Sequence, residues 1–518
     1  MRERLFGIET EYALSVLRSE RSADGDDDLL RALMGRVRQT HPHLPAHHSG
    51  VFLSNGARLY VDCGGHPEYC TPECTSPDEV VRHVLAGDRI LGELVGQLAG
   101  DRRGLALVLS KVNVDYGALT TWGSHESYLH AGRPAVLPRE LVPHLVSRLI
   151  YTGAGGFDIR HPGLCFLLSP RVPYLESTVS GDSTRNRAIF HAKDESLARP
   201  TDHRLHVICG ESLCSERASL LRVGATALVL ALIEAGERPG HSVALVAPLE
   251  AMRTFAADPE LVAAVPLAGG GQITAEAIQR HYLECVERHL GAPFLPPWAE
   301  PVCRAWREVL DGLRDRAPVL DSVLDWRIKR AIFEQHARKR GFPRDVVARW
   351  NDALTGGVER APEQSLLERQ ILAELSGVPP CFPRVDKKRL KAALADAALD
   401  RGRLESFLRL RRELFELDVR FSQVGDDGLF ARLDRAGVLH HHLEGLGDVD
   451  AARNTPPPGS RASVRGRVVR MLAARREKAV CDWSTVVRPK TGQCLDLSDP
   501  FVLEERWSSS PPPAPEPF

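Results

Sequence analysis

The stretch VFLSNGARLYVDCGG, residues 51–65, runs directly into HPEYCTPEC, residues 66–74, and predicts a strand, a Gly-Gly turn and a returning strand. Alternate side chains of a strand point to the same face of a sheet. The polar residues at alternate positions are Arg58, Tyr60 and Asp62 before the turn and His66 and Glu68 after it. The sequence therefore predicts a sheet in which one face carries charged and hydroxyl groups.

The segment GIETEY, residues 7–12, places Glu9 and Glu11 on one face of another predicted strand. Like charges at this spacing are unfavourable unless something offsets them. Further strands and loops show the same pattern and add Lys111, Asn113 and Asp115 in SKVNVDYG, His125 and Glu126 in WGSHESYL, and Arg204 and His206 in HRLHV. Two interpretations remain open, a polar face exposed to water and a site for a hard cation.

The residue types favour Mg²⁺ and a nucleotide over zinc in the second interpretation. Mg²⁺ takes oxygen ligands, and substrate phosphates often complete its shell. No thiolates are spaced to bind zinc, and the chain has no GxxxxGK[ST] motif of a P-loop. The segment STRNR supplies Arg185 and Arg187 as phosphate ligands, although ordinary surface arginines would look the same.

Composition limits the broad class of protein. The chain has 518 residues, is 43% hydrophobic and carries a formal net charge of −1, so it gives no case for general binding to nucleic acid or anionic membranes. Its N-terminus lacks the apolar core of a secretory signal, and no apolar run reaches the length of a membrane span. The 11 cysteines form no CxxC pair, which indicates a reduced, cytoplasmic protein.

The pattern along the chain predicts a large domain, a small one and a tail. Residues 1–450 form the large domain, in which about 350–410 look like a helical insertion, and 451–507 form a small C-terminal domain. Residues 141–153 and 217–236 show helical spacing, and the second segment is apolar all round. Residues 508–518, rich in Pro and Ser, are predicted to be disordered.

Other candidates favour structural interpretations. His440, His441 and His442 are consecutive, so diverging rings on a loop are expected more than a metal site. Cys70 and Cys74 are expected to be packed strand residues more than nucleophiles.

Several motifs occur together in a known order. They are GIETEY, LSNGARLYVDCGGHPEYCTPEC, GSHESYL, STRNRAIFHAKDES and RLHVICGES, followed by VLDWRIKRAIF, GLFARLDRAGVL, NTPPPGSRASVRG and CDWSTVV. In these motifs the chain resembles the ligase and the deamidase/depupylase that act on the prokaryotic ubiquitin-like protein Pup. That family is related to glutamine synthetase.

The resemblance implies an α+β fold, a curved antiparallel sheet cradle flanked by helices, with a smaller C-terminal domain, and it implies ATP and Mg²⁺ bound in the cradle. The matching positions imply a metal shell of Glu9, Glu11, Tyr60, Glu68 and His206, phosphate contacts from Arg185 and Arg187, and Arg461 and Arg465 near the nucleotide. Asp62 matches the catalytic aspartate, a base in the ligase and a nucleophile or water activator in the hydrolase.

The implied reaction activates the C-terminal glutamate of a Pup-like modifier as an acyl phosphate, which a substrate lysine then attacks. The hydrolase branch carries a long extra loop after the first strand, and the interval from Glu9 to Asn55 fits the ligase instead. A depupylase or deamidase is the alternative, and a non-catalytic Mg-ATP-binding adaptor is a second. The implied partners are the modifier, proteins that carry the target lysines and, functionally, a bacterial proteasome, with neither nucleic acid nor membrane.

The sequence departs from the family pattern at several positions. Ser127 and His191 stand where asparagine is usual, Lys193 replaces an arginine, and Leu213 replaces the asparagine of GDSN or GDAN. These departures bear on modifier recognition and on part of the nucleotide contacts.

Overall fold

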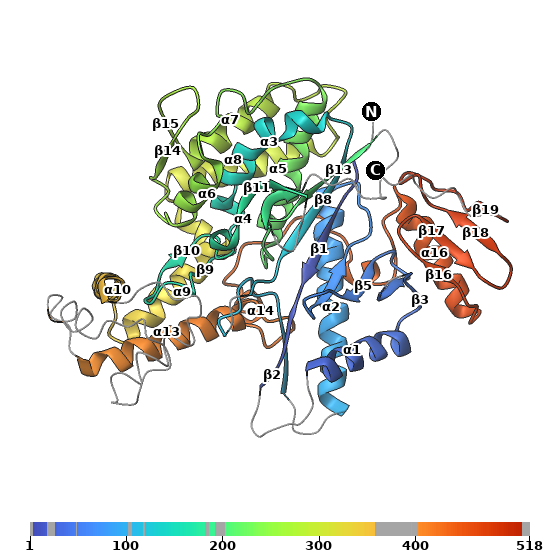
Figure 1. Cartoon of the computed structure of the whole chain (residues 1–518), viewed down its shortest axis with the longest axis horizontal. Helices are drawn as coiled ribbons and strands as arrows, with labels where there is room; N and C mark the ends of the chain where they lie inside the picture. The colour runs from blue at the N-terminus through green and yellow to red at the C-terminus, as the bar shows by residue number, and fades with distance from the viewer. Residues whose placement is uncertain are drawn as a thin grey trace.

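A computed structural model describes residues 4–17, 26–47, 49–101, 106–117, 120–181, 186–191, 202–357, 395 and 401–509 (Figure 1). Its centre is a nine-stranded sheet in the order β11-β12-β13-β8-β1-β6-β5-β4-β3. The strands are β1 (Phe6–Glu11), β3 (His43–Pro45), β4 (Val51–Leu53), β5 (Arg58–Val61), β6 (Pro67–Cys70), β8 (Ser124–His130), β11 (Ser177–Ser180), β12 (Ala188–His191) and β13 (His203–Val207). Neighbouring strands run antiparallel except β11 and β12, which are parallel.

Residues 51–62 form two strands, not the single strand predicted from sequence. β4 and β5 pair as a hairpin around Ser54–Ala57. Gly56 has φ of +81°, a conformation that favours glycine, and the Asn55 side chain accepts a hydrogen bond from the Ala57 amide at 3.1 Å. The Asn-Gly pair is a turn signal that the apolar residues on both sides obscured. The predicted Gly-Gly turn, between β5 and β6, is confirmed.

The sheet has one apolar and one polar face because successive side chains of each strand point to opposite faces. Phe6, Ile8, Tyr128 and Leu205 lie in the main hydrophobic core. Helices that contact the sheet from this side include α2 (Pro77–Asp101), α3 (Leu137–Ser147) and α5 (Glu216–Glu234). Residues 141–153 divide between α3 and α4 (Leu149–Thr152), and residues 217–236 match α5, which is buried along most of its length as predicted. The opposite face is left for polar residues.

Residues 111–115, which follow β7, do not continue the strand that the sequence predicted. β7 (Ala106–Ser110) pairs with β2 (Ala13–Leu17), away from the nine-stranded sheet, and ends before Lys111. Lys111 is buried against Asp88, at 2.7 Å between Nζ and Oδ2, and the Asn113 side chain bonds to the Ser212 backbone. The expectation that Lys111, Asn113 and Asp115 share a strand face is therefore wrong.

Helical elements complete the large body. They are α1 (Asp26–Thr40), α6 (Pro248–Ala256), α7 (Ala275–Glu287), α8 (Ala299–Arg314), α9 (Asp325–Lys339), α10 (Arg344–Gly357), α13 (Arg401–Phe421), α14 (Leu429–Arg435) and α15 (Val449–Ala452), with short strand pairs β9 (Gly156–Phe157)/β10 (Phe166–Leu167) and β14 (Ala264–Pro266)/β15 (Gln272–Thr274). α9, α10 and α13 lie together at one end of the molecule (Figure 1). Most of the predicted insertion between α10 and α13 lies outside the described residues.

The C-terminal unit packs against the β3 edge of the large sheet. It consists of α16 (Arg461–Ala474) and a four-stranded sheet of β16 (Val480–Cys481), β17 (Thr485–Arg488), β18 (Gln493–Asp496) and β19 (Trp507–Ser508). α16 and β16 contact β3, and Leu44 and Phe52 of the large sheet enter the core of this unit (Figure 1). Residues 510–518 of the predicted tail lie outside the described residues. None of the described helices is long and apolar enough to cross a membrane.

Candidate active site

The polar face of the sheet forms one wall of a cavity of about 540 Å³. Strand register gathers its residues: Glu9 pairs with His125 and Cys70 on the neighbouring strands, and Glu11 pairs with Glu68. The predicted site residues that line the cavity are Glu9, Glu11, Tyr60, Asp62, Glu68, Arg187 and His206. Strands β1, β5, β6 and β13 thus bring together side chains that are distant in sequence.

Glu9 lies at the centre of a group that could hold a cation. One ligand atom each of Glu9, His125 and His206 lies within 4.8 Å of the others, and Glu9, Glu68 and Cys70 form a second such group. Glu9 Oε2 is 3.6 Å from His125 Nδ1 and 4.0 Å from His206 Nε2, and Arg204 Nη2 is 3.1 Å from Glu9 Oε1. The signal for His125 and Arg204 was the same strand alternation that identified His206.

The carboxylates of this group differ in their proton affinity. Burial would raise the pKa of Glu9, but His206, His125 and Arg204 hold it well below its ordinary value. Burial and the facing Glu9 carboxylate raise the pKa of Glu68 well above its ordinary value. Burial also raises the pKa of Tyr60, so its phenol stays protonated.

These environments fit a bound divalent cation. A buried carboxylate such as Glu68 beside the ionised Glu9 is costly without a positive partner, and a cation reverses the sign of that interaction. Burial lowers the pKa of His206 well below its ordinary value, although the Glu9 carboxylate opposes this shift, and the unprotonated imidazole is the form that binds a metal ion. Carboxylate and hydroxyl oxygens are the ligands that Mg²⁺ prefers.

Asp62 lies in the same cavity and is held by its own turn. Its Oδ1 accepts a hydrogen bond from the His66 amide at 2.6 Å, and its Oδ2 is 3.1 Å from His66 Nδ1. Burial opposes ionisation of Asp62, but these bonds lower its pKa, and the same contact raises the pKa of His66. A Cβ at Gly64 would lie 2.7 Å from His66 Cε1, so glycine there allows the ring to reach Asp62. Asp62 is therefore kept as a carboxylate that can accept a proton.

Glu126 points away from the cavity, contrary to the sequence interpretation. It is fully buried on the core face, where Arg148 donates from Nη1 at 2.9 Å and from Nη2 at 2.6 Å, and Tyr128 donates at 2.5 Å. His125 and Glu126 are adjacent on β8, so strand alternation must place them on opposite faces. Glu126 anchors the strand, and His125 alone reaches the site.

The predicted phosphate and nucleotide arginines occupy different places. Arg187 lines the cavity, and its Nη1 donates to Thr121 Oγ1 at 3.0 Å, whereas Arg185 lies outside the described residues. Arg461 and Arg465 are buried and face Glu73, with 2.7 Å between Arg461 Nε and Glu73 Oε1. Their position near a nucleotide stays a prediction.

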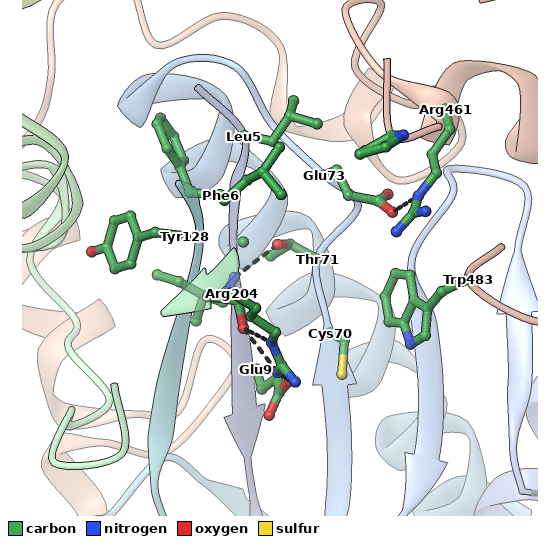
Figure 2. Close-up of a pocket in the computed structure, with 15 residues that line it drawn as sticks. Leu5, Phe6, Glu9, Cys70, Thr71, Glu73, Tyr128, Arg204, Arg461 and Trp483 are labelled. Atoms are coloured by element: carbon green, nitrogen blue, oxygen red, sulfur yellow. Dashed lines mark hydrogen bonds and ion pairs between the residues drawn. The ribbon is translucent and has the colours of Figure 1, made fainter. Parts of the chain in front are cut away.

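A second pocket of about 100 Å³ adjoins the cavity where the sheet meets the C-terminal unit (Figure 2). Its more apolar wall includes Leu5, Leu129 and Trp483, and Arg461 and Arg204 lie at its edges. Figure 2 shows Arg204 directed at Glu9 and Arg461 directed at Glu73, with Trp483 beside them. Trp483 lines both pockets, a contribution that nothing in its local sequence pattern indicated.

One known protein family matches most of the chain. The family model described as Pup-ligase protein matches residues 4–352 and 387–487. The chain belongs to the Pup-ligase family. The gap between residues 352 and 387 falls inside the predicted insertion, although the domain boundaries stay predictions.

Relatives of the Pup-ligase family match over nearly the whole chain. A Pup–protein ligase of Brachybacterium faecium is 32% identical, over 97% of this chain and 94% of the relative. One of Rhodococcus jostii is 37% identical, over 98% of each.

Two solved structures share the fold. The complex between Pup and its ligase PafA superposes with a TM-score of 0.73 at 24% identity, over 97% of this chain and 89% of that one. The ligase PafA in complex with ADP gives 0.66 at 22% identity, over 94% of each. The predicted family and the predicted α+β cradle with a smaller C-terminal unit are confirmed.

The departures from the family pattern divide between site and core. Ser127 Oγ lies 3.2 Å from His206 Nδ1 and accepts a hydrogen bond from Arg204 Nη2 at 3.0 Å, so it touches the cation group. Leu213 is buried, and its carbonyl accepts from Lys111 Nζ at 3.1 Å. His191 lines the cavity, and Lys193 lies outside the described residues.

Proposed function

We propose that this chain is an ATP-dependent ligase that joins the side-chain carboxylate of the C-terminal glutamate of a Pup-like modifier to lysines of other proteins. The observation that carries the proposal is that the candidate cation ligands Glu9 and Glu68 and the ionised Asp62 line one cavity. Such a cavity can hold a polyphosphate and a carboxylate side by side and can accept a proton. The names of the relatives, Pup–protein ligases, support the same reaction.

Mg²⁺ would be held by Glu9, Glu11, Tyr60, Glu68 and His206, and when bound it offsets the charge of phosphates and of the incoming carboxylate. Arg187, which lines the cavity, would contact phosphate oxygens, and the family resemblance implies the same role for Arg185. The adenine ring would enter the adjoining pocket, whose wall includes Trp483. The ADP complex of the structural relative supports nucleotide binding at this fold.

The reaction has two steps. The glutamate carboxylate attacks the γ-phosphorus of ATP, which releases ADP and leaves an acyl phosphate. The lysine amine then attacks the acyl carbon, the amide bond forms, phosphate leaves, and Asp62 takes the proton from the nitrogen. A lysine ammonium has an ordinary pKa of about 10.4, so placement of the amine beside Asp62 must supply the drive.

The reaction is placed in the cytoplasm, with a bacterial proteasome as a predicted functional link. The described cysteines include free thiols such as Cys63, Cys70 and Cys74, which suits a reducing compartment.

The test is conjugation in vitro with a Pup-like protein that ends in glutamate and a lysine-bearing acceptor. We expect a covalent product that requires Mg²⁺ and ATP and forms with one ADP released per bond. Asp62→Asn should abolish the product, whereas Asp101→Asn, at an exposed ion pair with Arg36, should leave it unchanged.

Release of free modifier or ammonia from a preformed conjugate or a glutamine-ended modifier, without stoichiometric ADP, would show a hydrolase instead. Binding of Mg-ATP with no turnover would show an adaptor.

A further inference from the structure

The histidines at residues 440–442 separate in the structure, and two of them converge. His440 turns toward the helix ending at Ser322, where its Nδ1 lies 3.0 Å from Ser322 Oγ. The rings of His441 and His442 instead lie 4.2 Å apart between centroids, tilted by 37°. The sequence expectation of diverging rings holds only for His440.

The two rings meet carboxylates from separate elements. Asp434 of α14 places Oδ1 3.2 Å from His441 Nε2 and 2.9 Å from His442 Nε2. On the other side of the pair, Glu216 at the start of α5 places Oε1 2.9 Å from His442 Nδ1. One ligand atom each of Glu216, His441 and His442 lies within 4.8 Å of the others.

We propose that Glu216, His441 and His442 bind a divalent transition metal ion of the zinc type. Two imidazoles and one carboxylate, with solvent in the fourth position, are a common ligand set for zinc. Zn–N bonds of about 2.0–2.1 Å place tetrahedral ligands roughly 3.3 Å apart, so the present spacing needs only small shifts of the side chains.

The surroundings are arranged as metal sites usually are. Asp434 accepts from the Nε2 of both rings, as carboxylates behind metal-binding histidines do. The Nδ1 of His442 then faces the Glu216 carboxylate, and the Nδ1 of His441 lies 3.4 Å from the Glu216 backbone amide. His441 is 3% exposed and packs on Phe430, and the Leu443 amide holds the other oxygen of Glu216 at 2.8 Å. His442 is 59% exposed on its side chain, which gives an ion a route from solvent.

The charges also suit a cation. Glu216 and Asp434 face two imidazoles, and Asp325 adds a further negative charge near His441. Arg217 contacts the His442 carbonyl at 3.4 Å, and its guanidinium also lies 4.0 Å from Glu308. A proton shared by the two imidazole rings would compete with a metal ion for this site. A metal ion here would tie the segment after α14 to the first turn of α5.

The experiment uses the full chain without a histidine tag, stripped with a chelator and titrated with Zn²⁺ against a chromophoric competitor. Because the active-site group could also take zinc, the comparison is between variants of the same chain. We expect His442→Gln to bind one equivalent fewer than wild type, and His440→Gln to bind the wild-type number. Co²⁺ should give the intense visible bands of a tetrahedral site in wild type and lose them in His442→Gln.

Asp434→Asn provides a second measurement, because it leaves the three ligands in place. We expect it to weaken Zn²⁺ binding about 10- to 100-fold without loss of stoichiometry. Equal stoichiometry and affinity in wild type and His442→Gln, or an equal loss in His440→Gln, would overturn the proposal. The ligase reaction is not used as a readout, so failure here leaves the proposed function untouched.

Discussion

Glu73 should hold the C-terminal unit on the sheet, and Glu73→Gln tests this directly. The Glu73 carboxylate faces Arg461 and Arg465 of α16, which are 2% and 0% exposed. Burial alone would raise the pKa of Glu73, but the two guanidinium groups lower it from 4.5 to about 2. That difference corresponds to roughly 3–4 kcal/mol of stability at neutral pH.

The sign of the pH dependence follows from the lowered pKa. The contribution of Glu73 is complete above its unfolded value of about 4.5 and disappears as the pH falls through about 2. At pH 3 about 1–2 kcal/mol of this stabilisation should remain. Breaking a buried ion pair by removing one partner costs about 3–5 kcal/mol, which agrees with the value at neutral pH.

Hydrogen exchange of the α16 backbone amides measures this contribution. At pH 7 we expect exchange in Glu73→Gln to be about 300-fold faster than in wild type, and at pH 3 about tenfold faster after correction for intrinsic rates. The control is Glu504→Gln, because Glu504 and Arg506 form a pair whose side chains are 73% and 77% exposed. It should change nothing at α16.

Unchanged exchange at α16 in Glu73→Gln at pH 7 would refute the proposed anchoring. A difference from wild type that is as large at pH 3 as at pH 7 would refute the electrostatic cause. If anchoring positions Trp483 in the nucleotide pocket, Glu73→Gln should also weaken ATP binding in an equilibrium titration.

Three further predictions separate the site from its support. Glu126→Gln should lower the free energy of unfolding by about 3–5 kcal/mol, because it leaves Arg148 without its buried partner. Urea titrations measure this loss, and unchanged stability would contradict the prediction. Conjugation at low temperature should persist in this variant. His66→Gln should raise the pKa of Asp62, so the acid limb of the kcat/KM profile should move to higher pH, and an unmoved limb would show that His66 does not act on Asp62. Glu68→Gln should raise the Mg²⁺ concentration for half-maximal conjugation by more than about tenfold, and an unchanged requirement would remove Glu68 from the ligand set.

Local sequence was sufficient to identify most of the sheet face. Glu9 and Glu11 share a face, as do Arg204 and His206, because a strand repeats every two residues whatever surrounds it. The family resemblance then implied a metal-binding role for Glu9, Glu11 and His206. The same periodicity, applied to residues 111–115, was misleading because β7 ends at Ser110.

Alternation alone could not say which face of β8 turns toward the cavity. His125 reaches Glu9 and Glu126 reaches Arg148, and that choice depends on buried partners far away in the chain. The Asn-Gly turn between β4 and β5 was visible in sequence, but apolar residues on either side favoured one continuous strand.

The sequence by itself determined the family, the cradle and the strand carboxylates Glu9, Glu11 and Glu68, because strand periodicity and motif order are properties of the chain read in order. Only the tertiary structure decided that Arg461 and Arg465 face Glu73, that Trp483 enters the site, and that His441 and His442 converge on Glu216. These contacts join residues hundreds of positions apart or depend on the path of a loop. They form where tertiary packing brings distant segments together, and a local sequence pattern does not show which segments will meet.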